Sequence, residues 1–304
     1  MAKTVARALD RIDSVQQRNR WAGLVVATLK KFQEDRSQYM AAMLAFWAFF
    51  SVFPLMLVLI SLLGFFLPGS MKTQVLGHVS SMFPMLNPSQ VGHLSGSVWT
   101  IVLGGVTALW SGSAVMRTAE YAFNSLWEIP VSDRPKMVGK LANSLWSLST
   151  IGLGLVVSSV ISGFVTGQDK GVNLGWAGYV AGYLVALALD VGVFVAAFRM
   201  LTDRDITFRD VLPGALVAGG AFWIFEQLSS LIVTRHLHQA QSTYGHFATV
   251  ITILWWFYLQ GLVTLIGAQL NVVIKRGLYP RSLTKAGQTE SDRRAREIYA
   301  QERT

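Results

Sequence analysis

Hydrophobic residues dominate six long stretches of the chain, and polar segments separate them. Each stretch has about 20 residues or more, which is the length that an α-helix needs to cross the hydrocarbon core of a bilayer. A soluble fold of this size could not easily bury so many separate apolar runs. We expect crossing helices at Ala41–Leu67, Ser97–Met116, Val138–Thr166, Asn173–Phe198, Val211–Thr234 and His246–Ile274. The pattern predicts an all-α polytopic membrane protein with six transmembrane helices.

Shorter segments carry apolar residues on one helical face only. Residues from Trp21 to Phe32 predict an amphipathic helix, which either lies on the inner membrane interface or packs on cytoplasmic loops. The segment Pro68–Gly96 predicts a short interfacial or re-entrant helix, and a further apolar stripe from Ala119 to Trp127 ends before Pro130. These elements add interfacial helices to the six crossings.

The polar ends of the chain flank one membrane domain. We expect a polar cytoplasmic tail at residues 1–20, a six-helix membrane domain at 21–278 and a solvated cytoplasmic tail at 279–304, partly helical from Ser291. Inside the first crossing, Pro54 removes one backbone donor and frees the carbonyl of Phe50, so a helix kink is expected there.

The basic residues alternate from one connecting segment to the next. Of the 26 Lys and Arg residues, 23 lie in the two terminal segments and in the second and fourth loops, and 3 lie in the remaining loops. The positive-inside rule assigns the 23 to the cytoplasm. Six crossings with both termini in the cytoplasm satisfy this alternation, whereas an odd number would break it.

Composition narrows the classes of function. Charged residues make up 14% of the chain and the net charge is +9. Because the positive charge follows the predicted topology, it indicates contact with anionic lipid heads and no specific nucleic-acid partner. The chain has no cysteine. This excludes disulfides, thiolate catalysis and cysteine-ligated metals.

Four stretches resemble one family of membrane proteins. They are AAMLAFWAFFSVFPLMLVLISLLG (41–64), YAFNSLWEIP (121–130), LPGALVAGGAFWIFEQ (212–227) and YGHFATVITILWWFYLQGLVTLIGAQLN (244–271). Together and in this order they are similar to the YihY/BrkB family of bacterial membrane proteins, over about residues 25–278.

The resemblance implies a six-helix protein of the bacterial inner membrane. The family was once labelled ribonuclease BN, and a role in transport of lipid or envelope precursors is what the resemblance suggests. Where the family commonly reads Gly-Ala-Glu, this chain reads Gly267-Ala268-Gln269. A mechanism that requires a carboxylate at that position is therefore not expected here.

Two carboxylates lie inside predicted crossings, where ionisable groups are costly. Glu226 is expected about 12 Å below the outer end of its helix, and Asp190 about 13 Å above the inner end of its own. Glu226 could bind a proton or substrate in a polar cavity, or it could be a packing residue that bonds a neighbour. Asp190 is expected to contact a freed backbone group or to extend toward Arg199. The two would mark different levels of one polar pathway.

Amide side chains could extend this pathway. Asn143, Gln260 and Gln269 lie in the third and sixth predicted crossings. His236, His238 and His246 cluster near the outer ends of two crossings, but their spacing matches no standard zinc motif, so neither a metal nor a cofactor is predicted.

Three classes of function remain open. A transport or translocation protein, acting on a lipid-like or envelope-precursor substrate, accounts for the short loops and the buried carboxylates. A membrane-embedded lipid-modifying enzyme would need a nucleophile and base pair, and none is evident in the sequence. The chain also offers no phosphate-binding glycine loop, so a ribonuclease is not favoured. A scaffold for envelope assembly is the third class. Membrane lipids are expected partners, and a homo-oligomer is compatible with the sequence.

Overall fold

The computed structural model describes residues 13–14, 16–66, 98–130, 143–154, 157–158, 175–244, 247–283 and 289–302. Within these ranges every regular element is helical. The helices are α2 (Arg20–Glu34), α3 (Ser37–Phe66), α6 (Val98–Leu126), α8 (Gly175–Met200), α9 (Phe208–Tyr244), α10 (Phe247–Arg276) and α11 (Glu290–Glu302). Residues 143–154 are also helical.

Five of these helices are long and apolar enough to cross a membrane. The qualifying stretches are Ser37–Val58, Val98–Leu126, Gly175–Met200, Phe208–Glu226 and Val250–Arg276. They confirm the expected first, second, fourth, fifth and sixth crossings as helices. The second helix is longer than expected, because α6 absorbs the apolar stripe that follows Met116. Of the expected third crossing, Val138–Thr166, the described residues include 143–154, which are helical. The expected interfacial helix within Pro68–Gly96 lies outside the described residues.

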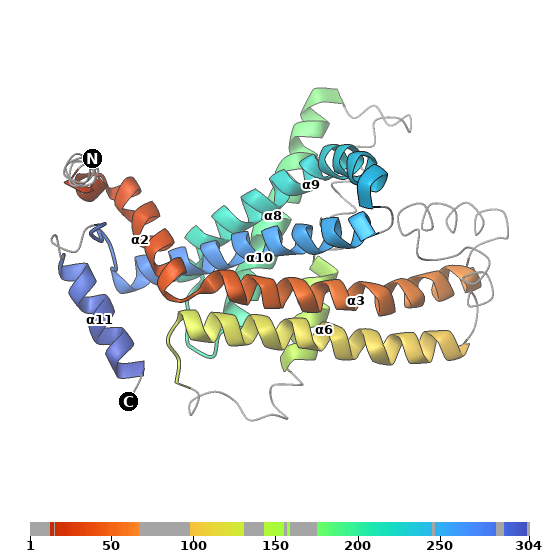
Figure 1. The fold of residues 1–304 in the computed structure, drawn as a ribbon, viewed down its shortest axis with the longest axis horizontal. Coiled ribbons are helices and arrows are strands. Elements are labelled where there is room, and N and C mark those ends of the chain that lie inside the picture. Colours follow the sequence, from red (N-terminus) through yellow and green to blue (C-terminus); the bar gives the residue numbers. More distant parts are fainter. Residues whose placement is uncertain are drawn as a thin grey trace.

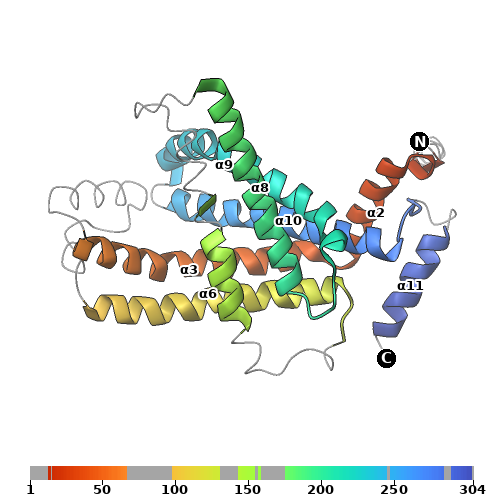
Figure 2. The same cartoon turned by 180° about the vertical axis from the view of Figure 1, so that it is seen from behind.

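Helices α3, α6 and α10 lie along the long axis of the molecule, and α8 crosses them steeply (Figures 1 and 2). Helix α10 packs against α3 on one side and α9 on the other, α6 pairs with α3, and α8 pairs with α9. Helix α3 continues through Pro54 as a single helix. Helices α2 and α11 lie together at one end of this bundle in both views (Figures 1 and 2). We call this end, which also holds the last turn of α10, the basal end, and the opposite end the distal end.

Chain direction follows from contacts at the basal end. Asn124, near the end of α6, bonds both the side chain and the backbone N–H of Asp203, just after α8. Lys275, at the end of α10, forms an ion pair with Asp210 in the first turn of α9. Helices α6, α8 and α10 therefore run toward the basal end, and α3 and α9 run away from it.

Burial is concentrated in the basal half of the bundle. The main core joins the first turns of α3 and α9 to the last turns of α6, α8 and α10; it includes Ala41, Leu44, Phe123, Leu126, Phe194, Phe198, Val211, Ala215, Leu265 and Val272. Toward the distal end, large apolar side chains are exposed on the helix surfaces, among them Leu103 (65%) and Trp176 (81%). Hydrocarbon is the natural solvent of such side chains, as expected for helices that face lipid.

Helices α9 and α10 meet at glycines. A Cβ on Gly214 would lie 2.0 Å from the carbonyl oxygen of Gly267, so only glycine fits at this crossing. The side chain of Asn271 adds a hydrogen bond, accepting from the Gly214 N–H at 2.7 Å. Two of the stretches that carry the family resemblance, LPGAL and GAQLN, thus form one tight helix crossing.

The segment after α10 is packed onto the protein. Leu278 and Ala295 form a second apolar cluster with Leu24 and Ala27 of α2 and Val273 of α10. One face of the expected solvated tail is packed against α2 and α10, where Arg281, Asp292 and Ala295 are buried, whereas residues such as Glu290 and Arg293 are exposed to solvent. The cytoplasmic location of this tail stays a prediction. The predicted helix is confirmed, beginning at Glu290.

Candidate functional site

Asp190 is the most deeply buried carboxylate of the membrane helices. Its side chain in α8 is 0% exposed, and its Oδ1 lies 2.5 Å from Ser158 Oγ. Its partner is thus a hydroxyl of the helix before it. Arg199, toward which we expected Asp190 to extend, instead donates from Nε to the carbonyl of Ile206.

Glu226 lies on α9, two turns beyond the tightly packed part of that helix. It is half-buried, and it lies within electrostatic reach of Asp190. Neighbouring aromatic residues form ring pairs with adjacent helices, Phe225 with Trp256 of α10 and Trp223 with Tyr183 of α8. The carboxylate therefore lies where α8, α9 and α10 come together in the distal half.

The predicted amide residues are distributed over different regions. Asn143 donates to the carbonyl of Met200 at 3.2 Å, at the basal end of α8. Gln260 is half-buried in the middle of α10, and its Oε1 is buried without a hydrogen-bond partner among the described residues. The structure does not bring Asn143, Gln260 and Glu226 together into one cluster of direct contacts.

Gln269 belongs to the basal end. Its Nε2 donates to Asp35 Oδ2 at 2.7 Å and to Ser37 Oγ at 3.0 Å, at the junction of α2 and α3. An ionised glutamate at this position could not donate and would face the carboxylate of Asp35. The departure from Gly-Ala-Glu is thus explained by a local need for a donor.

Around this junction, charged side chains form a buried network. The ammonium of Lys31 is completely buried and bonds Asp35, Glu128 and the hydroxyl of Tyr299. Arg276 pairs with Glu128 from the other side, at 2.7 Å. Two cations thus face two carboxylates, which is the balance that buried charges require.

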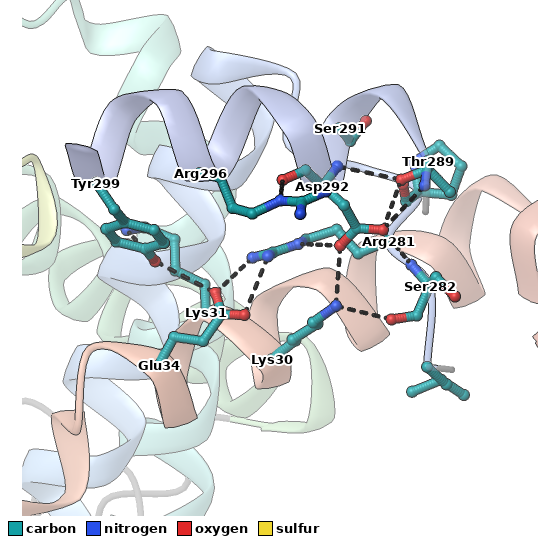
Figure 3. Close-up of polar contacts among 12 residues, drawn as sticks. Lys30, Lys31, Glu34, Arg281, Ser282, Thr289, Ser291, Asp292, Arg296 and Tyr299 are labelled. Carbon is teal, nitrogen blue, oxygen red and sulfur yellow. Dashed lines mark hydrogen bonds and ion pairs between the residues drawn. The ribbon is translucent and has the colours of Figure 1, made fainter. Parts of the chain in front are cut away.

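A second group of charges fastens α11 to α2 (Figure 3). The guanidinium of Arg281 donates two parallel hydrogen bonds to Glu34, at 2.7 and 3.0 Å, and its Nε donates to Asp292 at 3.1 Å. Lys30 reaches Asp292 from α2 at 2.9 Å. Figure 3 shows Arg281 between α2 and α11, where its guanidinium contacts a carboxylate from each helix.

These contacts and the burial of the network shift the pKa values of Asp292, Glu128 and Tyr299. Burial opposes charge on Asp292, but donors from Lys30, the Ser282 and Thr289 backbones and Arg281 outweigh it and hold the pKa of this carboxyl well below its usual range. Burial raises the pKa of Glu128 even though Lys31 and Arg276 act against that shift. Burial and the adjacent Asp35 raise the pKa of the Tyr299 hydroxyl.

The network contains residues that sequence reasoning missed. Lys31 and Glu128 were not among the predicted site residues. Glu120 was also missed; it is 2% exposed in α6 and lies beyond the predicted end of that crossing. The sequence did contain a signal for Glu120, because this carboxylate lies within an apolar stripe, Ala119–Trp127. Its burial costs free energy, as burial of a carboxylate inside a crossing does.

A metal centre finds no support in the described part of the chain. No group of three or more His, Asp or Glu side chains there could hold a metal ion. The side chains of His236, His238 and His246 lie outside the described residues.

Comparison with known proteins gives consistent matches. The family model described as Virulence factor BrkB matches residues 28–292. The ribonuclease-like protein YfkH of Bacillus subtilis is 24% identical over 262 residues, which is 81% of this chain and 93% of that protein. The UPF0761 membrane protein Mpe_A1422 of Methylibium petroleiphilum is 25% identical over 276 residues, 82% of this chain but 61% of that longer protein. No solved structure matches the chain significantly.

Proposed function

The chain belongs to the BrkB family of membrane proteins, and from this premise we propose that it moves a lipid-like or envelope-precursor substrate across the bacterial cytoplasmic membrane. The observation that carries the proposal is the position of Glu226, an ionisable residue on a membrane helix in the loosely packed distal half. Carboxylates are costly in a bilayer and are most often retained there for transport of a proton, an ion or a substrate.

The proposal includes six crossings with both termini in the cytoplasm. Helix α6 runs toward the basal end and α8 also ends there, so the chain between them must return to the distal side. Helical residues 143–154 fit this return, because Asn143 lies beside Met200 and an added Cβ on Gly154 would meet Val193. The 23 basic residues of the alternate segments support an orientation with the basal end in the cytoplasm.

Cysteine labelling tests this topology, since the chain has no native cysteine. Single cysteines at Asp133, Asp205 and the C-terminus should react only after the membrane is opened. Cysteines at Thr73, Asp169 and Gln241 should react with an impermeant reagent in intact cells. Labelling of position 205 from outside would overturn the proposed orientation.

The contrast between two halves of the bundle supports movement of a large amphipathic substrate. The basal half is closed by the main core and the ionic network, whereas the described distal half offers the half-buried polar groups of Glu226 and Gln260 among apolar side chains. A substrate with a polar head and apolar tails matches such surroundings, because its tails can remain in lipid while the head meets the polar groups.

Reconstitution into liposomes tests the activity itself. Vesicles containing phosphatidylethanolamine with a fluorescent head group should lose more fluorescence to an impermeant reductant when the protein is present than when it is absent. Glu226→Gln keeps the shape and removes the charge, so it should slow this loss several-fold while the protein remains folded. Glu226→Leu should impair both activity and folding if the residue also organises packing.

Asp205→Asn provides the matched control, because Asp205 is exposed in the loop between α8 and α9. It should translocate lipid at the wild-type rate. Equal rates for wild type, Glu226→Gln and empty vesicles would contradict lipid translocation. Full activity of Glu226→Gln alone would instead show that its charge is not used.

A further inference from the structure

The surroundings of Asp190 contain too few donors for an ionised carboxylate. In the part of the chain that the structure describes, Ser158 is its one hydrogen-bond partner, and Oδ2 is buried without any. No Lys or Arg forms an ion pair with it there. A buried carboxylate ordinarily accepts several hydrogen bonds or pairs with a cation.

The hydroxyl group of Ser158 lies near two oxygen atoms to which it could donate its hydrogen. Its Oγ lies 2.5 Å from Asp190 Oδ1 and 3.4 Å from the carbonyl oxygen of Ala186. A hydroxyl has one hydrogen, so it cannot donate to both oxygens at once. If Asp190 carries a proton on Oδ1, it donates to Ser158, and Ser158 is then free to donate to Ala186. The protonated acid satisfies both contacts.

Electrostatics favour the same state. Glu226 of α9 lies within electrostatic reach of Asp190, and a negative charge on Glu226 disfavours a second negative charge on Asp190. Asp190 is fully buried and Glu226 is half-buried, so the proton should remain on Asp190. Ser158, the described residue before α8 with a hydrogen bond to Asp190, supplies no charge.

We propose that Asp190 and Ser158 form a proton-binding site inside the membrane, and that Asp190 is a neutral acid at neutral pH. A metal cation fits less well, because hard cations such as Mg²⁺ and Ca²⁺ take about six or more oxygen ligands and the contacts here supply about half that number. A role of this proton in driving transport rests on the proposed function; the protonation state of Asp190 does not.

Infrared spectroscopy of the purified full-length protein tests the site. The C=O stretch of a carboxylic acid is separate from the bands of a carboxylate. Wild-type protein at pH 7 should show an acid band that Asp190→Asn abolishes and Glu226→Gln retains. Ser158→Ala should shift this band to higher frequency, because it removes the acceptor for the acid proton.

Matched controls lie nearby. Ser149, in the same helical segment, is exposed and bonds its own helix at Leu145, so Ser149→Ala should leave the band unchanged. Asp205→Asn should do the same. An acid band that persists in Asp190→Asn, or a wild-type spectrum without one, would overturn the proposal. A band that appears in choline chloride but not in sodium chloride would overturn it as well, in favour of a sodium site.

These outcomes are independent of activity. If the acid band is lost in Asp190→Asn but lipid does not move in the vesicle assay, the proton site stands and the proposed substrate is wrong. If lipid moves while the acid band belongs to another residue, the proposed function stands and the proton site is wrong.

Discussion

The basal and distal ends of this protein are stabilised by different interactions. At the basal end, Lys31, Asp35, Glu128 and Arg276 form a closed set of buried charges beside the main apolar core. Toward the distal end, side chains such as Leu103 are exposed on the helix surface. The basal end is held by close contacts within the protein, whereas the exposed apolar side chains of the distal end require lipid around them. If the proposed transport involves movement of helices, that movement is expected at the distal end.

The largest effect should come from Lys31. Replacing it with methionine leaves Glu128 and Asp35 short of a cation, which for a buried pair costs about 3–5 kcal/mol. The loss should appear as a lower free energy of unfolding in detergent micelles. Lys275→Met is the control, since Lys275 is half-exposed and its pair with Asp210 should contribute less than about 1 kcal/mol. Equal losses in the two variants would show that the buried network does not hold the basal end more strongly than an exposed ion pair does.

A smaller loss is expected at the glycine crossing. The added methyl group of Gly214→Ala would overlap the carbonyl of Gly267 and separate α9 from α10, at a cost of about 1–3 kcal/mol. Gly220→Ala, two turns farther along α9, meets nothing within 4 Å and should be neutral or stabilising. Unfolding in detergent measures both variants. If they behaved alike, the crossing would not be the point that holds α9 to α10.

Acid should loosen the basal end before it affects the crossing. The pKa of Asp292 is lowered in the folded protein, so its contribution to stability is fully present above its unfolded value, about 3.9, and is lost as the pH falls toward the folded value. Hydrogen exchange of α11 should therefore accelerate below about pH 4, relative to α9. Asp292→Asn should exchange fast at every pH, and Glu290→Gln, an exposed change, should follow the wild type. Exchange of α11 that does not depend on pH in the wild type would show that Asp292 does not hold this helix.

The smallest effect belongs to the distal surface. Leu103 is 65% exposed, and Leu103→Ala should change the free energy of unfolding by no more than about 0.5 kcal/mol in either direction. Leu265 is completely buried in α10, and the same substitution there should cost about 2–5 kcal/mol. A large loss for Leu103→Ala would indicate that a protein surface, such as a second copy of the chain, covers this face.

Much of the fold could be predicted because it depends on local composition. Length and hydropathy are sufficient for the membrane helices, and the predicted starts of α8 and α10, at Asn173 and His246, lie within a few residues of the observed ones. The polar site was harder. Asp190 and Glu226 were found because any carboxylate within an apolar run is costly, but their partners were not.

Long-range pairing explains what the sequence could not reveal. Lys31 meets Glu128 across 97 residues and Tyr299 across 268. No periodicity links such positions, and a lysine on an amphipathic helix is ordinarily solvated. The same limit applies to Gln269, which replaces a glutamate that is common in the family. Its partner Asp35 is distant in the sequence and lies beside it only in the folded protein.

The meeting of α2 with α11 also sets an order of events during biosynthesis. Helix α2 leaves the ribosome before the membrane helices that the structure describes, whereas Asp292 and Tyr299 follow all of them in the sequence. Lys30 must therefore remain hydrated while these helices are inserted, because its carboxylate partner Asp292 is made only after α10, and Lys31 gains its contact with Tyr299 equally late. Closure of the basal end thus reports that α10 and α11 have been synthesised. A chain released before residue 290 would insert its crossings but expose unpaired charges, which would distinguish it from the finished protein for cellular proteases.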